Sequence, residues 1–193
     1  MPRRVSAERR LLKPDPPLAD DQIRLEPLEQ RHALPLLAAI EGDDDVVRYT
    51  RVPADPDEAF VRSWIGQYER GWEDGTRAGF ASVARAGELL GFAAVVSLDL
   101  PAGEAELGYL VGREARGRGV ATRSLELLSR WSLDELGLER LELLIQPNNT
   151  GSERVAERAG YRLEGVLRSK HIRDGRRGDF GVWSLLRDDQ PLA

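Results

Sequence analysis

The apolar residues of this chain follow two alternating periodicities between Ile23 and Leu186. A repeat at every second position is typical of half-buried strands, and a repeat at every third or fourth position is typical of amphipathic helices. The run over 89–98 is nearly all apolar, which favours a strand buried on both faces. The pattern predicts strands at 22–25, 77–85, 89–98, 104–111, 140–146, 161–168 and 180–186, and helices at 30–40, 56–72, 120–136 and 150–159.

Local signals define the ends of these elements. Asp55 is predicted to cap the second helix, with Pro56 in its first turn. Thr150 and Glu153 form a capping box for the last helix. Gly108 interrupts the strand 104–111, which indicates either a bulge or the close approach of another group to the backbone. Asp174-Gly175 predicts the turn of a C-terminal hairpin.

Two helices carry predicted apolar faces. The first presents Leu34, Leu37 and Ile40 on one side. The second carries an aromatic stripe with a four-residue repeat, which favours core packing; as an alternative, one or two of the rings line a substrate pocket. The stripe consists of Phe60, Trp64, Tyr68 and Trp72.

Strands and helices alternate through the centre of the chain, and strands flank both ends. This order predicts an α+β (mixed α/β) fold with one mixed sheet covered by helices on both faces. Residues 1–20 are rich in basic residues and proline, which predicts a flexible N-terminal leader before a single domain at 21–193.

Composition narrows the class of protein. Hydrophobic residues make up 41% of the 193 residues and charged residues 32%, as in a globular, soluble domain. The net charge of −5 disfavours a nucleic-acid partner. The absence of cysteine and the presence of only two histidines disfavour metal sites and cysteine nucleophiles. No apolar run approaches the ~20 residues of a membrane helix, and no signal peptide is evident, so we expect a cytoplasmic protein without a membrane partner.

The segment Arg116-Gly117-Arg118-Gly119 stands between a predicted strand and a predicted helix. In that position the backbone N–H groups of the turn and of the first helical residues point toward one spot, where the helix dipole favours an anion. Arginines also suit phosphate oxygens. The alternatives are a flexible loop or an RNA-binding segment. The glycine spacing matches neither a dinucleotide fingerprint nor a Walker loop.

The string Arg116-x-x-Gly119-x-Ala121 is similar to the acyl-CoA pyrophosphate loop, [QR]-x-x-G-x-[GA], of the GNAT acyltransferase superfamily. The segments 146–152, 155–161 and 163–165 more narrowly resemble its ribosomal-protein-alanine N-acetyltransferase-like branch. The resemblance runs from about Ile23 to Leu186. It implies a GNAT-like single domain with a mostly antiparallel mixed sheet of six to seven strands, in which two central strands splay apart.

The resemblance also implies a site for acetyl-CoA as the acyl donor. Pantetheine would lie between the splayed strands and bond to backbone groups of Leu110 and Val111, one of which would be the oxyanion donor. Asn149 would hydrogen-bond the pantetheine arm or a backbone group across the gap. The pyrophosphate would be held by the backbone amides of Arg116, Gly117, Arg118, Gly119, Val120, Ala121 and Thr122.

Three side chains are candidate catalytic groups. Many relatives carry a tyrosine acid at the position of Ala156, so Ser152 is the replacement candidate; alternatively it only caps a helix. Glu106 could accept the proton of the amine through water. His171 is a second candidate base or an exposed hairpin residue, and the reaction could also need no base. We expect structural or substrate-orienting roles for Glu164 and Asp179.

The sequence therefore predicts an acetyl-CoA-dependent N-acetyltransferase that moves an acetyl group to a primary amine by direct attack on the thioester. A protein N-terminus and a small-molecule amine are both open as acceptors, and a monomer and a homodimer as assemblies. The alternative is a non-catalytic acyl-CoA-binding sensor or partner protein on the same fold. An acidic set would suit a cationic amine or form a solvated loop; it comprises Asp43, Asp44, Asp45 and Asp57.

Overall fold

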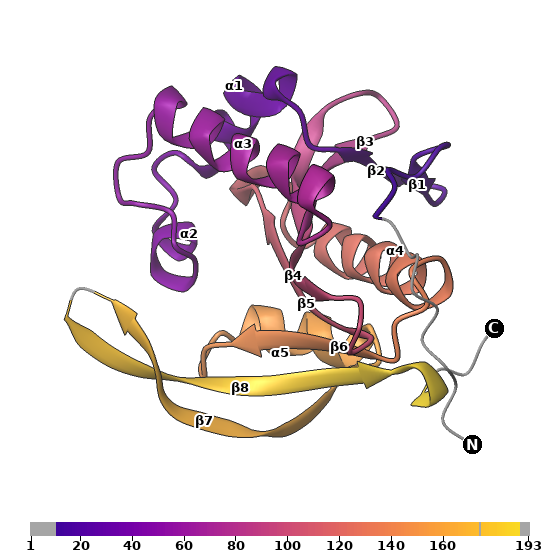
Figure 1. Ribbon diagram of the computed structural model, residues 1–193. Coiled ribbons are helices and arrows are strands. Elements are labelled where there is room, and N and C mark those ends of the chain that lie inside the picture. Colours follow the sequence, from indigo (N-terminus) through magenta and orange to yellow (C-terminus); the bar gives the residue numbers. More distant parts are fainter. Residues whose placement is uncertain (1–10, 174, 190–193) are drawn as a thin grey trace.

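One eight-stranded sheet organises residues 11–173 and 175–189, which are the residues that the computed structural model describes (Figure 1). The strand order is β1-β2-β3-β4-β5-β6-β8-β7, and every neighbouring pair is antiparallel except β5 and β6. The strands are β1 (Leu18–Ala19), β2 (Ile23–Pro27), β3 (Ala78–Ala84), β4 (Leu89–Asp99), β5 (Glu104–Val111), β6 (Arg140–Ile145), β7 (Arg162–Arg173) and β8 (Arg176–Leu186).

Helices cover both faces of this sheet, as predicted (Figure 1). One face packs against α4 and α5, and the other against α1 and α3, so two apolar cores share the strands. Along β5, Leu107 belongs to the first core and Leu110 to the second, because successive side chains of a strand point to opposite faces. The helices are η1 (Gln30–His32), α1 (Ala33–Ile40), α2 (Asp44–Tyr49), α3 (Glu58–Asp74), η2 (Arg113–Ala115), α4 (Val120–Asp134), α5 (Thr150–Arg158) and η3 (Arg187–Asp189).

The N-terminal edge of the sheet accounts for the strand beyond the predicted six to seven. Leu18 and Ala19 pair with β2, and Leu11 is buried against the first core. Leu11 therefore belongs to the core and Leu18 and Ala19 to the sheet, whereas the predicted leader extended to residue 20. Residues 1–10 lie outside the described residues.

Three predicted helix details differ from the structure. The cap of α3 is Asp57, whose carboxylate accepts a hydrogen bond from the Phe60 amide at 2.7 Å, and not Asp55. The cap of α5 is Asn149 and not Thr150. On α1 the apolar face is rotated, so Leu36 is buried while Leu34 is 56% exposed. Each difference is a shift along a correctly placed helix.

The aromatic stripe of α3 packs into the core, as its spacing predicts. Tyr68 and Trp72 are each 6% exposed. The Trp64 ring lies 4.8 Å from the Phe92 ring between centroids, and the Trp72 ring lies 5.9 Å from that of Trp131. The stripe is therefore chiefly a packing surface between α3 and the sheet.

Strands β5 and β6 are paired over only three positions, Glu104 to Glu106 with Arg140 to Glu142. Beyond them the two strands have no ladder, so the centre of the sheet is open at the end where β5 runs into η2. The short pairing of β5 with β6 confirms the prediction that two central strands splay apart.

The bulge lies on β4 and not at Gly108. Gly108 pairs regularly with Ala94, whereas the register shifts between Val95 and Ser97. A Cβ at Gly108 would lie 3.0 Å from a methyl carbon of Val96, so the glycine makes room for the side chain of the bulged residue. Close approach, the second of the two predicted readings, explains this glycine.

The C-terminal hairpin is longer than predicted, because β7 reaches Arg173 and β8 begins at Arg176. Gly175 lies in the turn, and its predicted partner Asp174 is outside the described residues. Within the described ranges, no helix is both long enough and apolar enough to span a membrane.

Candidate active site at the gap between β5 and β6

The open end of β5 exposes backbone groups to the gap. The Gly112 amide donates to the Leu90 carbonyl of β4 at 2.9 Å. Because alternate residues of an antiparallel strand bond to the same neighbour, the Leu110 amide also faces β4, and the Val111 amide faces the gap. The Val111 carbonyl points the same way and accepts a bond from Arg116 Nε at 3.2 Å. Of the two predicted backbone donors, only Val111 is therefore free of the β4 ladder.

The loop before α4 is shaped by two glycines. Gly117 and Gly119 have φ of +73° and +79°, in the left-handed region that favours glycine. A Cβ on Gly117 would meet no heavy atom within 4 Å, so the space above the loop is open. These glycines serve the turn itself and not the packing of another element over it.

Backbone amides converge on that open space. The first amide that donates within α4 is that of Arg123, to the Gly119 carbonyl at 3.0 Å, so the amides of residues 120–122 have no partner in the helix. The Arg116 amide instead donates to the Arg113 carbonyl at 3.3 Å and is not free, unlike its predicted role. A diphosphate fits this loop because unpaired N–H groups and the positive end of the helix dipole meet there.

The arginine side chains of the loop mostly point to carboxylates. Arg116 binds Asp43 at 2.6 Å, and Arg123 binds Asp20 at 2.8 Å. Among the described residues Arg118 has no acidic partner, and its side chain is exposed. The expectation that Arg116 offers its guanidinium to phosphate is therefore not met in this structure, because that group is already committed to carboxylates.

The first turn of α5 lies across the gap from this loop. Asn149 Oδ1 accepts the Ser152 amide at 3.2 Å and so caps the helix, which leaves only its amide nitrogen for a ligand. The Ser152 hydroxyl has no hydrogen-bond partner among the described residues, and Ser152 is half-buried. Asn149, and not Ser152, caps α5, so the serine hydroxyl is available.

Tyr109 links β5 to this helix, and its side chain was not among the predicted catalytic groups. Its hydroxyl donates to the Ser152 carbonyl at 3.2 Å, and burial raises its pKa to about 12. The ring shares a face with Leu107 and packs against the first core. The family's tyrosine position, Ala156, is fully buried in the same core. Only the proximity of α5, which is a long-range contact, distinguishes Tyr109 from an ordinary core tyrosine.

Glu106 is the carboxylate at the point where the β5–β6 ladder ends. Burial raises its pKa above the ordinary value of 4.5, and the nearby Glu142 raises it further, against the opposing charges of Arg51 and Lys170. A carboxylate with a raised pKa beside an open gap is suited to accept a proton.

Glu106 and Ser152 approach the gap from opposite faces of the sheet. Tyr109, which contacts Ser152, is on the α4 side of β5, and Glu106 is on the other side by alternation. A group placed in the gap thus has a candidate base on one side and a hydroxyl on the other.

His171 makes no hydrogen bond with Glu106 or Ser152 among the described residues. It lies on β7, three positions from β5 in the strand order, and its ring packs against Phe180 with centroids 5.4 Å apart. Its buried Nε2 has no partner among the described residues. The charge that acts on Glu106 from β7 is that of Lys170.

The other predicted polar residues have structural partners. Glu164 binds Arg140 at 2.6 Å and accepts the Ser184 hydroxyl at 2.7 Å, which holds its pKa at about 2. Asp179 accepts the Ser169 amide at 2.7 Å. In the acidic set, Asp57 caps α3 while Asp43 and Asp45 bind Arg116. These three aspartates are not available to a cationic amine.

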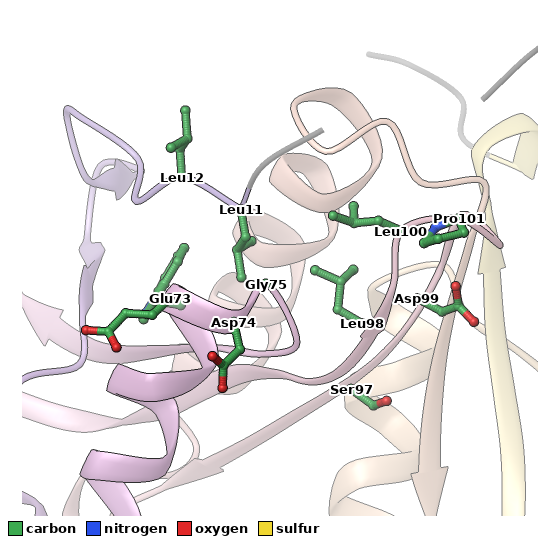
Figure 2. A pocket seen from close by; sticks show the side chains of 11 residues that line it. Leu11, Leu12, Glu73, Asp74, Gly75, Ser97, Leu98, Asp99, Leu100 and Pro101 are labelled. Carbon is green, nitrogen blue, oxygen red and sulfur yellow. The ribbon is translucent and has the colours of Figure 1, made fainter. Parts of the chain in front are cut away.

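A separate hollow of about 680 Å³ lies at the far end of β5, where β4 turns into it (Figure 2). Leu98 and Leu100 extend toward Leu11 across it, and Asp74 and Asp99 stand on its rim. Because the loop that contains Gly117 and Gly119 follows the opposite end of β5, this hollow is not part of the candidate active site.

A family model described as an acetyltransferase (GNAT) domain matches residues 22–162. The chain belongs to the GNAT acetyltransferase family, as the loop and the α5 motif predict, and is an N-acetyltransferase that uses acetyl-CoA as its donor.

One relative is named an N-acetyltransferase, and two solved structures share the fold. Spermidine N(1)-acetyltransferase of Escherichia coli (strain K12) is 27% identical over 153 residues, which are 79% of this chain and 80% of that protein. The structure of RimL, a ribosomal L7/L12 alpha-N-protein acetyltransferase in complex with coenzyme A, superposes with a TM-score of 0.81 at 16% identity over 90% of this chain and 98% of that chain. The structure of the microcin C7 self immunity acetyltransferase MccE, in complex with acetyl-CoA and AMP, superposes with a TM-score of 0.79 at 22% identity. The match covers 86% of this chain and 93% of that chain.

Proposed function

We propose that this enzyme acetylates a primary amine, which attacks the thioester directly from the Glu106 side of the gap. The observation that carries the proposal is the end of the β5–β6 ladder at Glu106 and Glu142, because it opens the sheet between a buried carboxylate and the first turn of α5. A thioester in this gap has room for an amine on one face while the other face meets Ser152.

Acetyl-CoA supplies the activated acyl carbon. Glu106 accepts the proton of the amine, directly or through one water, as the C–N bond forms. The Val111 amide donates to the thioester oxygen, on which negative charge develops. The backbone amides of Gly117 to Thr122 hold the pyrophosphate, and the amide nitrogen of Asn149 serves the pantetheine arm.

When the C–S bond breaks, the leaving thiolate gains a proton through the Ser152 hydroxyl, which gives up its own proton and takes one from solvent water in the same step. Tyr109 is a positioning residue in this step, because its own hydroxyl proton is committed to the Ser152 carbonyl and so fixes the first turn of α5. Ser152 therefore takes the part of the tyrosine that Ala156 replaces. His171 has no part in the scheme, because it packs against Phe180.

Ser152→Ala is expected to lower kcat about 100-fold, within the range for loss of a general acid. The thermal midpoint should stay within about 2 °C of wild type, because the hydroxyl has no hydrogen-bond partner among the described residues. A substitution that breaks no such contact changes the free energy of unfolding little. Thiol release from acetyl-CoA measures the rate. Tyr109→Phe, the comparison variant, should lower kcat less. Turnover undiminished in Ser152→Ala would remove the serine from the acid role and leave the enzyme assignment standing.

The acceptor class is tested by thiol release with a panel of amines. The panel comprises peptides with a free N-terminal alanine or serine, spermidine and an aminoglycoside, with the N-acetylated form of each as the matched control. We expect turnover with at least one primary amine and none with its acetylated form. Thiol release that is the same with and without amine would contradict transfer to an amine.

A further inference from the structure

The short helix α2 touches both sides of the active-site gap. It contains six residues, of which only Val46 is buried, and it stands apart from α1 and α3 in Figure 1. Its N-cap, Asp43, binds Arg116 of the phosphate-binding loop. At its other end the Tyr49 hydroxyl donates to the Asn148 carbonyl, just before α5, at 3.5 Å. With so little apolar burial, the position of α2 depends heavily on these two polar ends.

Arg116 joins α2 to the donor side with three separate contacts. Nη2 lies 2.6 Å from Asp43 Oδ2, Nη1 lies 3.0 Å from Asp45 Oδ2, and Nε donates to the Val111 carbonyl at 3.2 Å. The Asp43 side chain is only 3% exposed while that of Arg116 is 35% exposed, so this ion pair is partly buried. Arg113 adds a bond to the Gly42 carbonyl at 2.8 Å.

The chain that leaves α2 reaches the acceptor side. Arg51 follows two residues after Tyr49, and its positive charge opposes the burial that raises the pKa of Glu106. It acts in the same direction on Tyr68. A movement of α2 therefore changes the contact of Tyr49 with the residues just before α5. It also moves the positive charge of Arg51 relative to Glu106, the proposed base.

We propose that Arg116 is a positioning residue that couples the donor loop to the acceptor side of the site through α2. The neighbouring amides hold the pyrophosphate, while the guanidinium holds Asp43 and Asp45. Binding of acetyl-CoA, by fixing the loop, fixes α2 and so strengthens binding of the amine. This inference rests on the proposed function for the identity of the acceptor side.

Two variants test the coupling. Asp43→Asn keeps the helix cap, because asparagine caps as well as aspartate, but removes the charge that Arg116 binds. Arg116→Gln keeps the backbone of the loop. In both variants we expect the acetyl-CoA Kd to stay within about threefold of wild type, and KM for the best amine of the panel to rise roughly tenfold, as for a coupling of 1 to 3 kcal/mol between sites. Arg123→Gln, which breaks the neighbouring ion pairs with Asp20 and Asp21, is the matched control and should leave that KM unchanged.

Hydrogen exchange of α2 gives a readout that needs no acceptor. In wild type, acetyl-CoA should slow exchange of the amides at 46–50, and this protection should be lost in Asp43→Asn and Arg116→Gln but kept in Arg123→Gln. Protection of α2 supports the coupling even where wild type acetylates no amine, a result that would count against the proposed function alone. A tenfold loss of acetyl-CoA affinity in Arg116→Gln without any in Asp43→Asn would assign the guanidinium to phosphate and overturn the inference. Unchanged exchange and KM in both variants would overturn it as well.

Discussion

Thr122→Glu is expected to abolish measurable binding of acetyl-CoA while the fold is retained. Thr122 is the third residue of α4, and its amide is one of the three that have no partner in the helix. A glutamate at this position places a carboxylate where the pyrophosphate would lie. Two unit charges about 6 Å apart repel by roughly 3 kcal/mol at an effective dielectric constant of about 20, which corresponds to roughly a 100-fold loss of affinity for each phosphate charge.

Thr122→Gln is the matched control, since glutamine has nearly the same shape as glutamate but carries no charge. It should change the Kd only a few-fold. Titration calorimetry measures both, and thermal unfolding adds a second readout: acetyl-CoA at a hundredfold excess over Kd should stabilise wild type by ~2.7 kcal/mol and leave Thr122→Glu unshifted. Without ligand, the glutamate should be neutral or mildly stabilising, because an acidic side chain in the first turn favours the helix. Equal affinities for the two variants would show that no phosphate binds at this helix start.

Glu106→Gln is expected to lower kcat/KM about 100-fold or more, the range for loss of a general base. In wild type, kcat/KM should rise with pH through the pKa of Glu106, which burial holds above 4.5, and this acid limb should vanish in the variant. Glu142→Gln is the partner variant. Because the charge of Glu142 raises the pKa of Glu106, removing that charge should move the acid limb of the pH profile to lower pH. Glu106 itself remains as the base. An unchanged rate in Glu106→Gln would mean that the amine arrives neutral and that water takes its proton.

The same substitution should make the protein more stable near neutral pH. The pKa of Glu106 is higher in the folded state than in the unfolded chain, so between the two values the unfolded chain binds fewer protons. The free energy of unfolding therefore falls as the pH rises through that window. Above the window the buried carboxylate is charged and destabilises the folded state. Glutamine removes this cost. Urea unfolding at pH 5 and pH 8 should show a gain for Glu106→Gln that is larger at pH 8.

The elements that carry the cofactor site could be predicted because local rules determine them. Strand β5 has the predicted bounds Glu104–Val111, since alternation and the following glycines fix both ends. The start of α4 at Val120 follows from Gly119 in the left-handed conformation. The opening of the sheet beyond Glu106 was implied by the resemblance alone, because no periodicity records where two parallel strands separate.

The side chains that complete the site could not be predicted in the same way. The partners of Arg116 are more than 70 positions earlier in the chain, in an acidic run that composition alone describes as a solvated loop. Helix α2 buries a single apolar residue and so has no periodic signature. His171 was selected by its position in a resembled motif, and the packing of its ring on Phe180 depends on a hairpin register with an irregularity before it.

The three paired positions between β5 and β6 also make this sheet two mechanical units joined at a narrow seam. One unit contains β1 to β5, and the other contains β6, β8 and β7, which are paired along nearly their whole lengths. Separating the units would break few backbone hydrogen bonds, and the first apolar core, which contains residues of both units, holds them together. A pantetheine arm bonded along β5 would lengthen the seam, so the donor would add backbone hydrogen bonds at the point where the sheet has fewest.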